Sequence, residues 1–194
     1  MIEKVKKILI ASLLITSSAY ADSSDYLYES RSLVGFEGGY SAFDVKDVGN
    51  NIKREESSAV GGIKIGAETS NIRMFLSFRN AFIDDYDYAY MYGVELQYLF
   101  NMSDAVNFYI GANIGRVSFR FNEYAATNIT RDFTTEYMGG DIGFNWHMTK
   151  TVDLELGARL MSLPDPDHIL NGEKYTFDDI TMGYMSIIFK YQMD

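Results

Sequence analysis

Charged residues recur at alternate positions within segments that are otherwise apolar or small, and this spacing is the most chemically informative feature of the chain. Alternate residues of a β-strand face the same side, so these charges share one face of each strand. A charge on an enclosed face is costly unless it is paired, so opposite charges there are expected to form ion pairs. The acids at such positions are Glu37, Glu68, Glu95, Asp141, Asp153 and Glu155, and the bases are Lys64, Arg73, Arg79, Arg159 and Lys190.

The near-equal numbers of acids and bases predict an interior network of salt bridges. By depth along their strands, Glu37, Lys64, Glu95, Asp141 and Arg159 are expected to lie closest to the middle. Two interpretations of such a network remain open. It could be a polar plug that keeps the protein rigid, or a gated ion path whose pairs rearrange to open a narrow channel. The predicted network comprises Glu37, Lys64, Arg73, Arg79, Glu95, Asp141, Glu155 and Arg159.

Eight segments have the alternating pattern of a strand that must position these charges. On the opposite face of every segment no position is charged, although 23% of the chain is charged. A soluble barrel of the lipocalin type would point these apolar faces inward, but eight strands leave an interior just wide enough for side chains to fill. The apolar faces are therefore predicted to face lipid. The segments are 34–42, 59–67, 72–82, 88–100, 106–114, 138–146, 152–160 and 183–191.

The segment Tyr88–Phe100 is ordered by depth as well as by face. Its apolar face has aromatic residues at both ends and Val94 and Leu96 between them. Twelve residue steps, tilted by about 40°, rise roughly 30 Å, which matches an apolar band of about 25 Å between two aromatic girdles. The predicted girdle residues are Tyr88, Tyr90, Tyr92, Tyr98, Phe100, Trp146, Phe189 and Tyr191.

The connections between the segments alternate in length, which is typical of transmembrane barrels with short turns at one end. The longest are Asp44–Ser57, Asn122–Arg131 and Leu163–Asp179. After Gly115 the alternation slips, which indicates either a β-bulge near Gly115–Arg116 or a strand that continues above the bilayer as an exposed ribbon. The predicted fold is all-β: an eight-stranded antiparallel up-and-down transmembrane β-barrel.

The N-terminus has the features of an export signal. Three lysines precede an apolar run, and Ala19-Tyr20-Ala21 follows as a cleavage site, which predicts a signal peptide over 1–21. A short periplasmic lead over 22–32 and a barrel over 33–194 would follow. The chain has no cysteine, and its formal net charge of −10 argues against nucleic acid as a partner.

With these features the chain resembles the small eight-stranded outer-membrane barrels of the OmpA/OmpX type, within the porin-like barrel families. The resemblance covers the whole mature chain and implies the outer membrane of a Gram-negative bacterium, a lipid and lipopolysaccharide environment, and a monomer. In such families the last strand is the signal for the barrel-assembly machinery. Ile187, Phe189 and Tyr191 suit that signal, although the chain continues to Asp194 instead of ending in Phe.

Catalysis is not predicted. Some barrels of this size modify lipid A, and the deacylase type places a Ser two residues from a His. The nearest match is His147-Met148-Thr149, which has Thr instead and falls in a predicted periplasmic turn, while His168 lies in the longest connection without a nearby Ser.

Two acidic clusters in the predicted loops could hold Ca²⁺ or Mg²⁺ against lipopolysaccharide phosphates, but a solvated loop surface is the simpler interpretation. No metal and no cofactor are therefore predicted. The clusters are Asp84, Asp85 and Asp87, and Asp165, Asp167, Glu173, Asp178 and Asp179.

The predicted function is a structural or surface-interaction role, with any extracellular ligand bound through residues 44–57, 122–131 and 163–179. The first alternative is a narrow gated, porin-like ion channel. A lipid A-modifying enzyme and a soluble lipocalin-like binder are the remaining alternatives.

Overall fold

A computed structural model describes residues 30–47, 52–83, 86–122, 130–164, 167–170 and 173–192. The predicted signal peptide over 1–21, most of the lead over 22–32, and Asp84, Asp85 and Asp165 lie outside these residues. Within them, no helix is long and apolar enough to cross a membrane.

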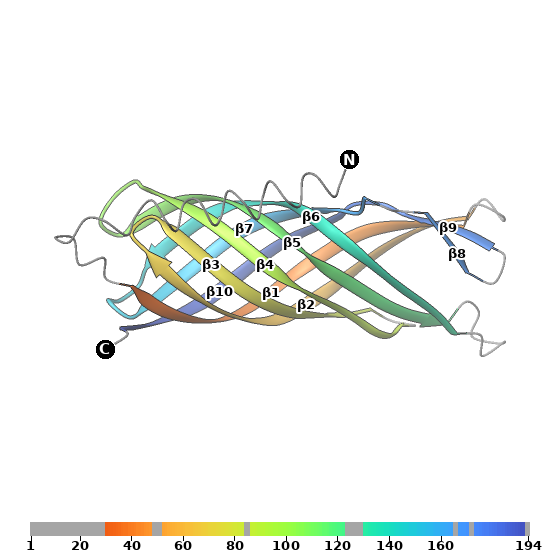
Figure 1. Cartoon of the computed structure of the whole chain (residues 1–194), viewed down its shortest axis with the longest axis horizontal. Helices are drawn as coiled ribbons and strands as arrows, with labels where there is room; N and C mark the ends of the chain where they lie inside the picture. The colour runs from red at the N-terminus through yellow and green to blue at the C-terminus, as the bar shows by residue number, and fades with distance from the viewer. Residues whose placement is uncertain are drawn as a thin grey trace, which may run out of the picture.

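Eight long strands form a closed antiparallel barrel, drawn in Figure 1 with strongly tilted strands. Each strand pairs with its neighbours in the chain, and β1 and β10 pair with each other to close the ring. The all-β, eight-stranded up-and-down fold is thus confirmed. The strands are β1 (Arg31–Asp47), β2 (Ile52–Thr69), β3 (Ile72–Phe82), β4 (Tyr86–Asn101), β5 (Val106–Asn122), β6 (Thr130–His147), β7 (Val152–Ser162) and β10 (Ile180–Gln192).

Two further strands lie at one end of the barrel. β8 (Asp167–Leu170) and β9 (Glu173–Phe177) form a hairpin, and β9 pairs with the end of β1 at Val45–Asp47. In Figure 1 this hairpin lies at the end opposite the C-terminus. The short connections lie at the C-terminal end, which is periplasmic in an outer-membrane barrel, so the hairpin marks the extracellular end.

Two of the long extracellular connections predicted from the sequence, 44–57 and 163–179, contain strand, so their predicted boundaries are wrong, whereas the bounds of 122–131 agree with the strand ends to within two residues. β1 and β2 remain paired up to Asp47 and Ile52, inside the predicted connection 44–57. β5 and β6 remain paired up to Asn122 and Thr130, at the ends of the predicted connection 122–131. The predicted connection 163–179 contains β8 and β9.

The predicted β-bulge near Gly115–Arg116 is also absent from the pairing. Gly115 opposes Gly93 and Arg116 opposes Tyr92, so the register of β4 and β5 continues there without a shift. The register of this pair shifts further along, between Tyr86 and Tyr88. The second interpretation is the better one, because β5 continues beyond the apolar band with its neighbours still paired.

A further one-residue irregularity lies between β9 and β10. Phe177 opposes Val45 and Thr181 opposes Ala42, so four steps on one side match three on β1. The extra residue lies at Asp178–Asp179, and the Asp178 amide donates to the Asp44 carbonyl at 2.9 Å. The irregularity lets Phe177 and Ile180 both face the interior, where both are buried.

The polarity of the two barrel faces is inverted at the extracellular end. In the part of β5 before Gly115, toward the periplasmic end, Ile110 and Ile114 face outward and Asn113 faces inward. Beyond Gly115, Arg116 faces outward while Val117 and Phe119 are buried inside. This inversion explains why the alternation slips without a change in register. It also explains the wrong boundaries, because a search for outward apolar residues ends where the outer surface meets water.

Candidate functional site: the charged interior and its apolar cap

The central part of the barrel interior is occupied by a cluster of ion pairs around Glu37 and Glu95. Arg79 donates through Nε to Glu37 and through Nη2 to Glu95. Arg159 joins the same two carboxylates, with Nη1 at 3.2 Å from Glu37 and Nη2 at 2.7 Å from Glu95. Lys64 lies 3.6 Å from Glu37. All five side chains are buried, so four strands besides β1 are tied together across the interior.

A second cluster lies nearer the periplasmic end, around Asp153. Arg73 Nη2 donates to Asp153 at 2.5 Å, and Arg73 Nε donates to Glu68. Lys190 Nζ lies 2.6 Å from the other Asp153 oxygen. Glu155 links the two clusters, because it accepts from Lys64 at 2.5 Å and lies 3.9 Å from Arg73.

Tyrosines fill the interior where glycines face them. The Tyr109 and Tyr184 hydroxyls lie 2.7 Å apart, in front of Gly143 and Gly157. A Cβ added at Gly157 would lie 2.7 Å from Tyr184 Cζ, so a larger residue there would clash with the ring. The Arg159 guanidinium stacks over the Tyr184 ring at 4.5 Å, which adds a cation–π contact to the central cluster.

Asp141 differs from the other interior acids. It accepts from Asn113 Nδ2 at 3.0 Å and from Gln97 Nε2 at 3.4 Å, and among the described residues it forms no salt bridge. Four buried side-chain atoms have no hydrogen-bond partner within the described part of the chain. They are Gln97 Oε1, Asn113 Oδ1, Glu155 Oε2 and Arg159 Nε.

An apolar core caps the polar interior at the extracellular end. Phe119 stacks on Phe43 with ring centroids 5.3 Å apart and on Phe133 at 5.9 Å. Phe177 of the β8–β9 hairpin stacks on Phe133 at 3.9 Å. The rings come from β1, β5, β6 and β9 and are all buried, so the core closes the barrel above the ion pairs.

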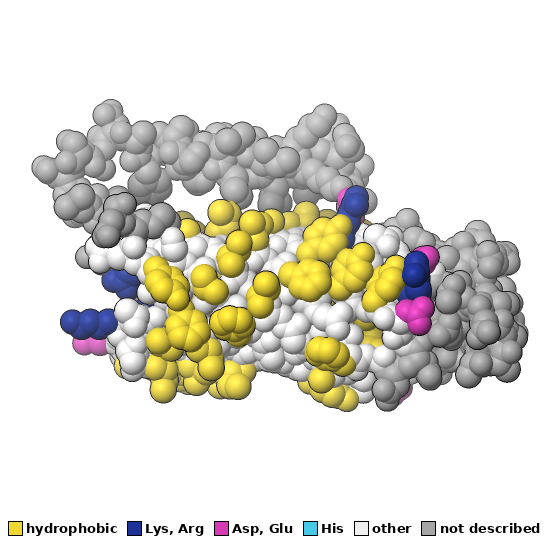
Figure 2. All heavy atoms as spheres, turned by 90° about the horizontal axis from the view of Figure 1, so that it is seen from below, with side chains coloured by type: hydrophobic (Ala, Val, Ile, Leu, Met, Phe, Trp, Pro, Cys, Tyr) yellow, Lys and Arg dark blue, Asp and Glu magenta, His cyan; other side chains and the backbone are white. Residues whose placement is uncertain are grey.

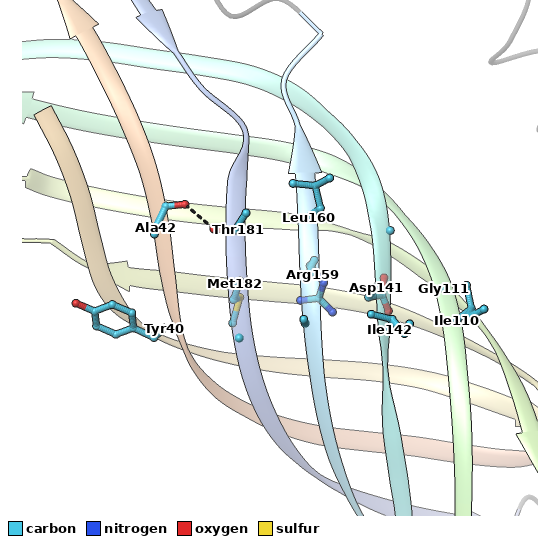
Figure 3. A pocket seen from close by; sticks show the side chains of 13 residues that line it. Tyr40, Ala42, Ile110, Gly111, Asp141, Ile142, Arg159, Leu160, Thr181 and Met182 are labelled. Atoms are coloured by element: carbon cyan, nitrogen blue, oxygen red, sulfur yellow. Dashed lines mark hydrogen bonds between the residues drawn. The ribbon is translucent and has the colours of Figure 1, made fainter. Parts of the chain in front are cut away.

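The outer wall is apolar over the region between the two ends. Figure 2 shows hydrophobic side chains over this wall and charged side chains toward its ends. A shallow hollow of about 550 Å³ crosses the wall from β5 to β1. Small residues such as Gly140, Ala158 and Gly183 line it, together with Asp141 and Arg159, which lie at one level on β6 and β7 (Figure 3).

The aromatic residues assigned to the girdles from the sequence all occupy outward-facing strand positions. Tyr98 and Phe100 pack edge to face at 4.9 Å near the periplasmic end of β4. Tyr88, Tyr90 and Tyr92 follow one another along the extracellular half of β4. Trp146, Phe189 and Tyr191 lie on β6 and β10 toward the periplasmic end.

Charged pairs line the outer surface above the apolar wall. Arg120 Nε donates to Asp132 Oδ1 at 2.6 Å, and the Tyr88 hydroxyl donates to the same oxygen at 3.2 Å. The Arg120 hydrogen bond lowers the pKa of the Asp132 carboxyl below its ordinary value. Arg116 and Glu136 form a looser pair at 3.7 Å. Such residues suit water or lipid headgroups.

The structure brings the predicted interior residues together, with Asp141 beside the ion pairs instead of within them. Sequence reasoning did not identify Gln97 and Asn113 as the partners of Asp141. These residues could have been found from the strand register, because Gln97 on β4 and Asp141 on β6 both lie opposite Gly111 of β5. Sequence reasoning also missed the residues of the apolar cap. The change in the alternating pattern at Val117–Phe119 was the feature that could have indicated them.

The two histidines do not form the predicted catalytic alternative within the described side chains. His147 Nδ1 lies 2.8 Å from Asp153 Oδ1, and its Nε2 lies 3.1 Å from Asn107 Nδ2. Thr149 hydrogen-bonds to Thr151 in the exposed turn. His147 therefore belongs to the periplasmic ion-pair cluster. The side chain of His168 lies outside the described part.

A closed barrel with an apolar outer wall and a polar, ion-paired interior defines the class of transmembrane outer-membrane barrels. The chain belongs to the outer membrane protein beta-barrel domain family, whose model matches residues 8–186. The protein is therefore located in the outer membrane of a Gram-negative bacterium, in contact with its lipids, and the soluble lipocalin-like alternative is wrong. No curated protein matches the sequence.

Solved structures with this fold include Neisserial surface protein A, with 15% identity and a TM-score of 0.58 over 82% of this chain and 97% of that one. The N-terminal barrel domain of OprF from Pseudomonas aeruginosa has 10% identity and a TM-score of 0.58 over 84% and 98%. OprH from P. aeruginosa has 14% identity and a TM-score of 0.52 over 82% and 99%. At these identities the likeness is one of fold.

Proposed function

We propose that this protein is a closed, monomeric barrel with a structural or surface-interaction role and no catalytic activity. The observation that carries the proposal is the double closure of its interior. Ion pairs join the strands at the level of Glu37, and stacked rings around Phe119 fill the interior above them. Opening a path would separate buried charges, which costs about 3–5 kcal/mol for each broken pair.

The surface-interaction role rests on the extension above the apolar wall. β1 and β2, β5 and β6, and the β8–β9 hairpin all continue into this region. A packed apolar core holds these strands in place, so their outer faces offer a fixed surface for a partner. Any extracellular ligand is proposed to bind through residues 44–57, 122–131 and 163–179, now interpreted as strand ends and their connections. In biogenesis, the outward Ile187, Phe189 and Tyr191 of β10 are proposed to engage the barrel-assembly machinery.

A narrow gated ion channel is the second candidate, and the unpaired acceptors near Asp141 favour it. Buried oxygens without donors mark places where water or an ion could reside during passage. In this candidate, Arg79 and Arg159 would exchange partners to open a path beside Glu95.

Planar-bilayer recording separates the two candidates. The closed barrel predicts no discrete conductance steps for the wild type, and none for Glu95→Gln. Steps in the wild type whose size or frequency changes in Glu95→Gln would contradict the closed barrel and support the channel. The matched control is Asp132→Asn, because Asp132 lies on the outer surface and cannot affect an interior path.

The structural role has its own test in cells. Deleting the gene should raise the uptake of a hydrophobic dye through the outer membrane, and the wild-type gene should restore the barrier. A variant with residues 167–174 replaced by a short turn, which keeps Phe177 in the cap, should restore the barrier but lose binding to any surface partner. Unchanged uptake after deletion would argue against the structural role.

A further inference from the structure

Asp141 is a buried interior acid that the salt bridges described above do not include. The salt bridges described above connect five bases with five acids, and His147 lies beside Asp153 as a further base. Asp141 is the sixth acid and forms no salt bridge with a described residue. Its neighbour on β7, Arg159, donates hydrogen bonds from its two terminal nitrogens to Glu37 and Glu95. Among the described residues, the Asp141 carboxylate is therefore stabilised by two neutral amides and not by a direct ion pair.

Asp141, Gln97 and Asn113 converge on one place in the interior. Gln97 and Asp141 lie at one level on β4 and β6, on either side of Gly111, and Asn113 lies one inward position further along β5. The Asp141 carboxylate leans over Gly111, since a Cβ built there would lie 2.7 Å from Asp141 Oδ2. All three side chains are more than nine-tenths buried. A small ligand at this position would be enclosed by these side chains and by the barrel wall.

The two amides each have an unpaired oxygen beside the carboxylate. Asn113 and Gln97 direct their nitrogens to Asp141, which leaves Asn113 Oδ1 and Gln97 Oε1 without a donor among the described residues. An amide keeps its shape when it rotates by half a turn, and the rotation exchanges its oxygen and nitrogen. After rotation, both oxygens would face the carboxylate. That arrangement is unfavourable alone and favourable with a cation between them.

We propose that Asp141, Gln97 and Asn113 bind one alkali-metal cation, Na⁺ or K⁺, inside the barrel. Carboxylate and amide oxygens are the ligands that hard cations prefer. The site holds one carboxylate and two neutral amides, which selects a monovalent ion, because a single positive charge neutralises the Asp141 carboxylate. The bound ion would be a structural part of the closed barrel. The proposal is independent of whether the protein conducts, since a resident ion requires no continuous path.

The first test is thermal unfolding of the full chain in detergent micelles at neutral pH. NaCl, KCl and choline chloride are compared at equal ionic strength, because choline is too large for the enclosed site. The midpoint of the wild type should be a few °C higher in NaCl or KCl than in choline chloride. Asp141→Asn should lose this difference, and Asp132→Asn, the same change on the outer surface, should keep it.

The second test locates the ion directly in the wild type. Crystals grown in a rubidium salt should give an anomalous peak within coordination distance of the Asp141 carboxylate. The rubidium experiment needs no variant, so it tests the proposed cation site even if Asp141→Asn fails to fold.

Three results would overturn the proposal. Equal midpoints in the three salts would do so, as would a sodium or potassium effect that persists in Asp141→Asn. The third is a rubidium peak elsewhere, or none. Stabilisation by acid alone, without a cation effect, would instead indicate that Asp141 carries a proton.

Discussion

The lower and upper halves of β5 lie on one continuous ladder but have opposite polarity. In the lower half, Ile110 faces outward and Asn113 faces the ion pairs. In the upper half, Arg120 faces outward and Phe119 faces the stacked rings. The pairing of β5 with β6 keeps one register through both halves, so the difference arises from the surroundings. Lipid requires an apolar wall, and water above the membrane requires a polar one.

The comparison also shows two ways of filling a narrow barrel. Within the membrane, large charged side chains satisfy one another across the interior, as Arg79 does with Glu37 and Glu95. Above the membrane, aromatic rings fill the same width by stacking. The first arrangement depends on complete pairing, whereas the second depends on shape and apolar area. The two halves should therefore respond differently to substitution. In the tests below, denaturant-induced unfolding of the barrel is followed in lipid vesicles through Trp146, the single tryptophan.

The largest effect is expected for Arg79→Met in the lower interior. The substitution keeps the bulk of the side chain but leaves Glu37 and Glu95 with fewer partners in a buried position. The free energy of unfolding should fall by about 3–5 kcal/mol. Arg120→Met, which breaks an exposed pair in the upper half, is the control and should unfold like the wild type. Equal effects of the two changes would contradict the difference between the halves.

A charge on the outer wall should be costly in the lower half alone. Ile142 and Thr134 both face outward on β6, eight residues apart, with Ile142 at the level of the apolar wall. Ile142→Arg should lower the unfolding free energy by about 2–4 kcal/mol, because the charge would enter the hydrocarbon. Thr134→Arg should change it by less than about 0.5 kcal/mol. If both variants have the same free energy of unfolding, the limit of the lipid-facing wall does not lie between Thr134 and Ile142.

A hydroxyl group inside the upper half should have a smaller effect. Val117 is buried in the apolar cap, and Thr135 opposes it on β6 with an inward side chain. Val117→Thr keeps the shape and buries a hydroxyl, so it should destabilise the barrel by about 1–2 kcal/mol. The reverse change, Thr135→Val, should be neutral or stabilising. A stabilising Val117→Thr would indicate that the cap is hydrated.

The smallest effect is expected from pH on the outer pair of the upper half. The Arg120 hydrogen bond lowers the pKa of Asp132, so the carboxyl titrates at a lower pH in the folded than in the unfolded chain. Its contribution to stability is present above the unfolded pKa of about 3.9 and is lost as the pH falls through the folded value. The stability difference between wild type and Asp132→Asn should therefore shrink below about pH 4. A difference that grows on acidification would contradict the sign.

The membrane half could be predicted from the sequence because lipid imposes a strict rule on its outer face. Outward residues such as Ile63, Leu96 and Ile142 carry no charge, and their spacing marks each strand. The upper half could not be delimited in this way. Val117, Phe119 and Phe133 obey the rule of a soluble sheet, so a search for lipid-facing residues ends before them.

The candidate site was only partly predictable for a different reason. Strand parity places Glu95, Asp141 and Arg159 inside, but parity does not give register. Only the pairing with Gly111 shows that Gln97 lies at the level of Asp141 on the β4 side. Only the side-chain contacts show that Arg159, the neighbour of Asp141 on β7, donates to Glu37 and Glu95 instead. Likewise, the acids of the connection 163–179 gave no sign that Asp178–Asp179 interrupts a strand.

The unbroken ladder through Gly93 and Gly115 has a consequence for the evolution of this barrel. No bulge or turn lies where the polarity of β4 and β5 changes, near Gly93 and Gly115, so this change is specified by side chains alone. Exchanging a few residues of opposite polarity across the two faces could raise or lower the boundary while every backbone hydrogen bond is kept. By substitutions alone, descendants of this chain could thus adapt to membranes of different thickness, or extend longer strands above the membrane, without an insertion in a loop.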